Sequence, residues 1–124
     1  KIVVLLILSI SAASWAYPKT KCGSSSNHDL IQGFRQYGDR LLYSTREKMP
    51  KSFLRVKSRD VEWPAQHMHV YERITRIEVL DQKHDGSGGC AFLFGGGVGQ
   101  NYVKLHLKTQ RGGSFDFLIN IYGR

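Results

Sequence analysis

The sequence has few of the residues on which several protein classes depend. Its 124 residues include only two cysteines and three prolines, and its 13 glycines follow no triplet period. These shortages exclude a disulfide-dense scaffold and a collagen-like chain. No apolar run reaches the roughly 18–20 residues that a membrane-spanning helix needs. Since 41% of the residues are hydrophobic and 23% are charged, the composition is that of one ordinary globular domain.

Residues 1–16 have the layout of a secretory signal peptide. A basic residue precedes an almost uninterrupted apolar stretch over residues 2–10, and Ser14 and Ala16 supply the small side chains that cleavage requires. A strand or core helix at this place in the chain is the alternative. We expect cleavage after Ala16, which leaves residues 17–124 as a single secreted domain.

A secreted chain folds where thiols are oxidised, and this changes the interpretation of the two cysteines. Cys22 and Cys90 both follow the expected cleavage point, and a disulfide between them is the simplest expectation. In the chain-entropy account, closing so long a loop stabilises the fold by roughly 4 kcal/mol. A catalytic thiol is the alternative, but the apolar residues that follow Cys90 disfavour the thiolate that a nucleophile needs.

The first half of the mature chain gives a mixed signal. Residues 29–43 carry apolar side chains partly at helical spacing, but glycines interrupt them. We therefore expect a short helix or turn that leads into a strand near residues 40–44. Residues 45–51 are charged and include Pro50, which predicts a turn.

Runs with a period of two predict β-strands over the rest of the chain. The expected strands are residues 53–57, 61–63, 69–80, 90–94, 103–108 and 115–122. The apolar residues of 69–80 fall on both faces, so a bulge or a change of exposure is expected midway. The last two strands flank Gly112-Gly113 and are expected to form a hairpin. The predicted fold is all-β, a small antiparallel sandwich or open barrel of about five to seven strands.

Two motifs could suggest a cofactor or a metal. The glycine cluster over residues 95–99 lacks the Gly-Lys-Ser/Thr ending of a phosphate-binding loop, and Gln100 stands where a dinucleotide motif needs glycine. A turn or bulge is expected there instead. His67 and His69 could hold an incidental metal, but no third ligand follows from the spacing, so solvent-facing histidines are the simpler expectation. No cofactor and no metal site are predicted.

No set of residues points to catalysis. The carboxylates are scattered and mostly neighbour lysine or arginine, which is typical of a solvated surface. No serine lies in a Gly-x-Ser-x-Gly elbow, and no His-Glu-x-x-His pattern occurs. We therefore expect a protein that is not an enzyme.

Positive charge is concentrated in one segment. The formal net charge is +8, from 18 lysines and arginines against 10 aspartates and glutamates. The basic segment carries Arg46, Lys48, Lys51, Arg55, Lys57 and Arg59, with Phe53 among them. These side chains could contact a partner, a polyanion or an anionic lipid surface. A solvated edge strand kept soluble by its charges is the alternative. Secretion argues against an intracellular nucleic acid as the target.

The C-terminal third carries several segments in a distinctive order. They are residues 74–82, the glycine cluster, residues 108–112 and the closing residues 117–123. In order and spacing they resemble the insect multiprotein bridging factor type two family, and the likeness extends over most of the mature chain.

This resemblance implies two alternative roles for the protein, each in a different cellular location. The family is named for a transcriptional co-activator that bridges a DNA-bound nuclear receptor to basal transcription factors without binding DNA itself. Many members nevertheless resemble small secreted proteins. The leader-like N-terminus favours an extracellular binding protein whose partner is another protein, and a nuclear or cytoplasmic co-activator is the alternative. The family brings no catalytic motif, so no functional residue is carried over, and no direct sequence-specific binding to DNA is expected.

Overall fold

The computed structural model describes residues 20–21, 26–66 and 68–124, and this part of the chain consists of β-strands and loops. The strands are β1 (Thr20–Lys21), β2 (Leu30–Gly33), β3 (Arg40–Met49), β4 (Ser58–Trp63), β5 (Ile74–Asp81), β6 (Cys90–Gly96), β7 (Val103–Lys108) and β8 (Phe115–Gly123). The predicted all-β fold is therefore confirmed, with β1 as a two-residue addition to longer strands. Over the same residues, no helix has the length and apolar character needed to cross a bilayer.

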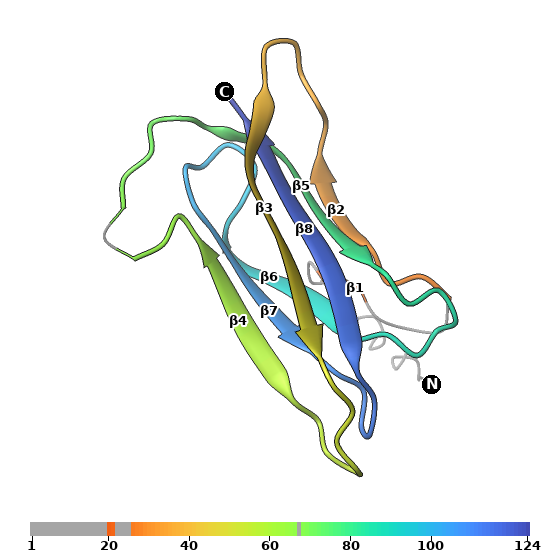
Figure 1. The fold of residues 1–124 in the computed structure, drawn as a ribbon. Coiled ribbons are helices and arrows are strands. Elements are labelled where there is room, and N and C mark those ends of the chain that lie inside the picture. Colours follow the sequence, from red (N-terminus) through yellow and green to blue (C-terminus); the bar gives the residue numbers. More distant parts are fainter. Residues whose placement is uncertain (1–19, 22–25, 67) are drawn as a thin grey trace, which may run out of the picture.

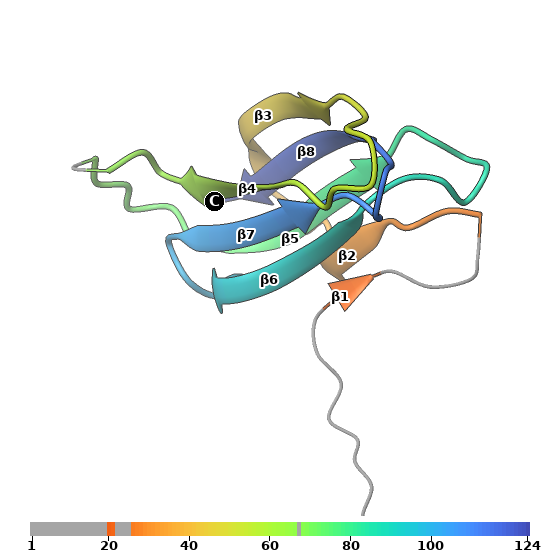
Figure 2. The same cartoon turned by 90° about the horizontal axis from the view of Figure 1, so that it is seen from below.

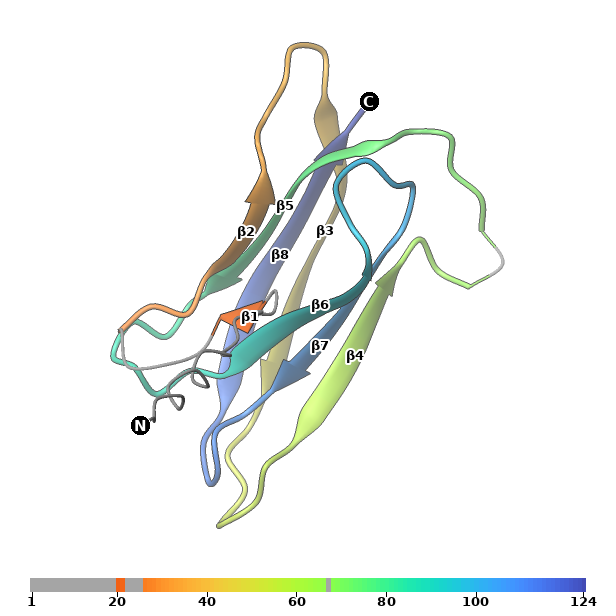
Figure 3. The same ribbon diagram turned by 180° about the vertical axis from the view of Figure 1, so that it is seen from behind.

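The strands form two antiparallel sheets that pack against each other as a sandwich. Sheet A has the order β1-β6-β7-β4, and sheet B has the order β2-β5-β8-β3. Figure 2 shows the two sheets as two layers, with β6 and β7 below β3 and β8. Strands β1 and β2 lie toward one side of the sandwich, and β3 and β4 lie toward the other (Figures 1 and 3). Of the two predicted arrangements, the sandwich is the one found.

The core lies between the sheets and follows from strict alternation along β7 and β8. Every second residue of each strand is buried, and the residues between them are half-buried on the outer faces. The inward residues are Val103, Leu105, Leu107, Phe115, Phe117, Ile119 and Ile121. Because a large apolar side chain contributes about 1.5–3 kcal/mol when fully buried, these two strands anchor the fold.

The last two strands do not form the predicted hairpin. β7 pairs with β4 and β6, whereas β8 pairs with β3 and β5. The connection over residues 109–114 therefore crosses from sheet A to sheet B (Figure 1). Alternation reports only that one face of a strand is buried. A facing sheet about 10 Å away buries that face in either case, so the pattern cannot distinguish a hairpin from a crossing.

The structure bears out part of the prediction for residues 29–51. A turn at residues 37–38 leads into a strand that begins at Arg40, as expected, whereas β2 and the extension of β3 beyond residue 44 are not predicted. β2 pairs with β5, and β3 continues to Met49, through most of the segment over residues 45–51 that the sequence assigns to a charged turn. Along β3, Arg46 and Lys48 are exposed while Thr45 and Glu47 are half-buried. Polar residues at these inward positions of an edge strand conceal the period of two.

The connection between β3 and β4 also differs from expectation. Residues 53–57 form a turn followed by an irregular stretch, and their large apolar side chains are exposed instead of packed in a sheet. β4 includes the predicted residues 61–63 and begins three residues earlier, at Ser58.

β5 runs from Ile74 to Asp81, so residues 69–73 of the predicted strand over residues 69–80 do not form part of it. The pairing of β5 with β8 shifts in register between Ile74 and Arg76, which confirms the predicted bulge. The shift reverses the alternation, and as a result Ile74, Ile77 and Val79 are all buried.

The glycine cluster forms the predicted bulge and turn. The pairing of β6 with β7 shifts in register between Leu93 and Gly95, and Gly96, Gly97 and Gly99 have positive φ. At Gly96, a Cβ atom would lie 2.1 Å from the carbonyl oxygen of Tyr102. Only glycine fits so close an approach of two backbone segments.

Candidate functional site

The basic segment lies along the β3–β4 side of the sandwich and around one of its ends (Figure 1). Two of its six predicted contact residues bind carboxylates of their own chain. Arg46 donates from Nε and Nη2 to the two carboxylate oxygens of Asp116, at 2.8 and 2.7 Å. Arg59 donates to Glu47 at 3.0 Å and so links the edge strands of the two sheets. These two arginines are therefore engaged in the fold.

The Arg46–Asp116 pair changes the acidity of both groups. Hydrogen bonding from Arg46 lowers the pKa of Asp116, and the lysines Lys48 and Lys83 lower it further through their charge. The same hydrogen bond raises the pKa of Arg46. Asp116 is thus held ionised, and its charge is already neutralised by Arg46.

The other four predicted residues are Lys48, Lys51, Arg55 and Lys57, and none of them forms a salt bridge with a carboxylate that the structure describes. Lys48, Lys51 and Arg55 are exposed, and Lys57 is half-buried. The structure brings them together at the end of the sandwich where β3 ends and β4 begins. Within the basic segment, this end carries the uncompensated positive charge.

A pocket of about 310 Å³ opens beside Lys48, which we call the lysine pocket. It is lined by Lys48, Met49, Pro50, Lys83, Ser114, Phe115 and Asp116. Two ammonium groups, one hydroxyl group and a neutralised carboxylate suit a small anionic group. Lys83 carries no signal in the sequence, because only the packing of the sandwich places its loop next to the end of β3.

A second hollow, the aromatic groove, lies on the outer face of sheet A. It is lined by Asp60, Phe92, Phe94 and His106 and has a volume of about 300 Å³. Nδ1 of His106 lies 2.6 Å from the Asp60 carboxylate, and its ring lies 5.8 Å from Phe92 and 6.5 Å edge-on from Phe94. The groove offers apolar area with one polar wall, which suits an aromatic or aliphatic side chain of a partner.

A buried polar cluster joins the start of β2 to the end of β5. His28 and Asp81 are both buried, although the sequence favours solvent-facing histidines and surface carboxylates. The Asp81 carboxylate accepts the backbone N–H of His28 at 3.0 Å and that of Lys83 at 2.9 Å. Nδ1 of His28 lies 3.0 Å from the carbonyl oxygen of Gly89. Since neither side chain reaches solvent, the pair organises the backbone and does not meet a substrate.

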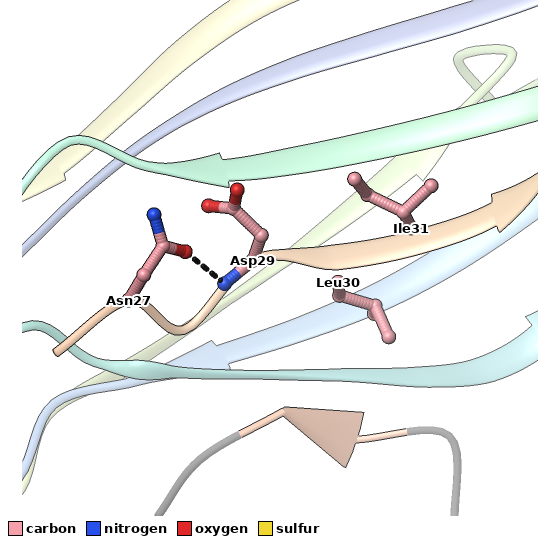
Figure 4. A pocket seen from close by; sticks show the side chains of 4 residues that line it. All are labelled: Asn27, Asp29, Leu30 and Ile31. Carbon is pink, nitrogen blue, oxygen red and sulfur yellow. Dashed lines mark hydrogen bonds between the residues drawn. The ribbon is translucent and has the colours of Figure 1, made fainter. Parts of the chain in front are cut away.

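A third hollow, of about 450 Å³, lies beside β2 (Figure 4). It is lined by Asn27, Asp29, Leu30 and Ile31, and Leu30 and Ile31 point to opposite sides of the strand. The side-chain oxygen of Asn27 accepts the N–H of Asp29 at 2.9 Å. The Asp29 carboxylate in turn accepts the N–H of Asp81 at 2.7 Å. These side-chain oxygens therefore accept hydrogen bonds from backbone N–H groups at the start of β2 and the end of β5.

The predicted metal and disulfide residues lie partly outside the described residues. His69 is exposed and His67 falls outside them, so an incidental metal at this pair stays a prediction. In the described ranges, no group of three or more His, Cys, Asp and Glu side chains could hold a metal ion. Cys22 also falls outside, and the disulfide to Cys90 stays a prediction. Lys21, which precedes Cys22, pairs with Ala91, which follows Cys90. This pairing brings the residue before Cys22 close to Cys90 and supports the prediction.

Comparison with known proteins gives a family and a relative. The model of the family described as Transcription activator MBF2 matches residues 32–123. A curated protein of Bombus ignitus, named "Probable salivary secreted peptide", is 38% identical over 101 residues, which cover 82% of this chain and 73% of that relative. No solved structure matches the chain.

Proposed function

Since this chain belongs to the Transcription activator MBF2 family, we propose that it is a small secreted protein that acts by binding another protein and not by catalysis. Family membership confirms the resemblance seen in the sequence. The family description is that of a transcription activator, so the extracellular role is argued from further observations.

The observation that carries the proposal is the similarity to a protein named as a secreted peptide. The alignment with the Bombus ignitus protein extends over most of the domain, at 38% identity. The leader-like pattern of residues 1–16 points in the same direction.

The surfaces of the domain support a binding role. The aromatic groove presents Phe92, Phe94 and His106 on rigid strands of sheet A. Aromatic side chains on an open sheet face are typical of a contact surface, because burying them against a partner gains free energy. The buried His28–Asp81 cluster, in contrast, has no access to a substrate.

The intact mass of the protein recovered from the medium of expressing insect cells tests the proposal. We expect a chain that begins at Tyr17 and is lighter by two hydrogens than its reduced form, because of the disulfide. Recovery of the uncleaved chain only from inside the cells, with both thiols reduced, would contradict secretion.

A transcriptional co-activator is the second candidate, and the family description "Transcription activator" is the observation that favours it. Microscopy of a C-terminally tagged chain separates the two candidates. Accumulation in nuclei would favour the co-activator, whereas passage through the secretory pathway into the medium would favour the secreted binding protein.

A further inference from the structure

The β3–β4 loop combines exposed apolar side chains with positive charge. Phe53 is 85% exposed, Leu54 is 59% exposed and Val56 is 45% exposed. Folded domains rarely leave three large apolar side chains so close together in water without a use for them. We call residues 51–57 the apolar-cationic loop, since Lys51, Arg55 and Lys57 lie between and beside the apolar residues.

The apolar-cationic loop is held in place by the neighbouring connection between the two sheets. The N–H of Gly112 donates to the carbonyl oxygen of Arg55 at 2.8 Å, and the guanidinium of Arg111 donates to that of Leu54 at 2.9 Å. Leu54 has a φ of 56°, a left-handed conformation that a branched side chain rarely adopts. The fold thus maintains a strained turn that directs apolar side chains into solvent.

The charge around this loop is of one sign. No aspartate or glutamate occurs between Lys48 and Arg59. Lys48 and Lys83 line the lysine pocket at the end of β3, and Asp116 in that pocket is neutralised by Arg46. This end of the sandwich therefore offers an anionic group a pocket between two lysines, close to a loop with an apolar tip.

We propose that this end of the domain binds the surface of a membrane that contains anionic phospholipids. Phe53 and Leu54 enter the interfacial region, while Lys51 and Arg55 contact headgroup phosphates and the lysine pocket takes one further phosphate. A soluble polyanion would be bound by the cations alone and would leave the apolar tip in water. Apolar side chains flanked by basic residues are what an interfacial membrane contact requires. This inference goes beyond the proposed function and depends only on the folded domain.

Co-flotation with vesicles tests the proposal. The purified chain is mixed with vesicles of phosphatidylcholine alone or of phosphatidylcholine with about 30% phosphatidylserine, since each basic residue near an anionic surface strengthens binding about fivefold. We expect the chain to bind the anionic vesicles more strongly than the vesicles of phosphatidylcholine alone. Lys51→Ala combined with Arg55→Ala should weaken this binding roughly twenty-fivefold. Phe53→Ser should weaken it about tenfold, because the lost apolar contact acts independently of charge.

Matched control variants lie at the opposite end of the sandwich. Phe34→Ser removes an aromatic side chain that is 78% exposed in the β2–β3 connection, and Arg73→Ala with Lys104→Ala removes two charges there. All variants share the same N-terminus, so any contribution of residues 1–16 to lipid binding is the same throughout. We expect the controls to bind anionic vesicles as the unsubstituted protein does.

Several outcomes would overturn the proposal. Absence of binding to anionic vesicles would do so, as would equal losses in the control variants. Retention on heparin that requires Lys51 and Arg55 but not Phe53, without binding to vesicles, would assign the surface to a soluble polyanion instead. Secretion of a protein that fails to bind vesicles would refute this inference and leave the proposed function intact.

Discussion

Substitution of Asp81 tests how much the buried polar cluster stabilises the fold. The Asp81 carboxylate accepts backbone N–H groups of His28 and Lys83. Gly88 packs so closely on it that a Cβ there would lie 2.5 Å from Oδ1. Asp81 thus joins the start of β2, the end of β5 and the loop that leads to β6. We expect Asp81→Ala to destabilise the domain more than most single surface substitutions would.

The magnitude follows from the two hydrogen bonds. A hydrogen bond to a charged acceptor contributes about 1.5–3 kcal/mol, and a buried donor left without a partner costs about 1–3 kcal/mol. Without the carboxylate, the partly buried N–H of Lys83 can donate to water, whereas the N–H of His28 is buried and loses its partner. The free energy of unfolding should therefore fall by about 2–4 kcal/mol in Asp81→Ala, and by about half as much in Asp81→Asn, which keeps one acceptor oxygen.

Urea denaturation followed by circular dichroism measures this effect. A change in the midpoint at constant slope reports stability alone, and the expected loss corresponds to about 1–3 M urea. Asp85→Ala is the matched control, because Asp85 is exposed in the same loop and bonds only to Ser87 among the described residues. We expect its midpoint to stay close to that of the unsubstituted protein. A loss in Asp81→Ala below about 0.5 kcal/mol would refute the reasoning.

Three further substitutions test other parts of the fold. Phe117→Ala removes a fully buried ring from the centre of β8 and should lower the free energy of unfolding by about 3–5 kcal/mol in the same assay; a loss below about 1 kcal/mol would contradict this placement. Gly96→Ala should destabilise by more than about 1 kcal/mol, because its φ of 66° and its contact with Tyr102 exclude a Cβ; a stabilised variant would show that the close approach is not present. Because Arg46 lowers the pKa of Asp116, the pair stabilises the fold above the unfolded carboxyl pKa near about 4, and this contribution is lost as the pH falls through the lower folded value. Asp116→Asn should therefore lose less stability than the unsubstituted protein between about pH 5 and pH 2, as measured by urea midpoints, and equal losses would contradict the pair.

The strands of the second half could be predicted because each has one face toward the core. The alternation of β7 and β8 and the bulge of β5 are visible in the sequence, since they follow from local side-chain order. The pairing of strands is not local. The sequence of residues 103–122 does not indicate whether β7 and β8 share a sheet. The structure places them in different sheets.

In the candidate sites, too, the sequence predicts local features but not contacts between distant residues. The sequence locates the basic segment, but it cannot show that Arg46 meets Asp116 or that Lys83 lies beside Lys48, because these contacts arise from pairing of distant strands. The burial of His28 also gives no signal. The histidine lies in a polar stretch just before β2, and its burial comes from contacts with distant parts of the chain, among them Asp81 and Gly89.

The place of β8 in sheet B has a consequence for how the protein is made. In the described part of the chain, β8 is the neighbour of both β3 and β5, and it pairs with β3 across nearly seventy intervening positions, as in Lys48 with Asp116. Until β8 has been made, β3 has no paired strand among the described residues and sheet B stays incomplete, whereas all four strands of sheet A precede β8. Such long-range pairing makes folding slow, in the range of milliseconds to seconds. Sheet B, and with it the buried core between the two sheets, can therefore be completed only after β8 has been made.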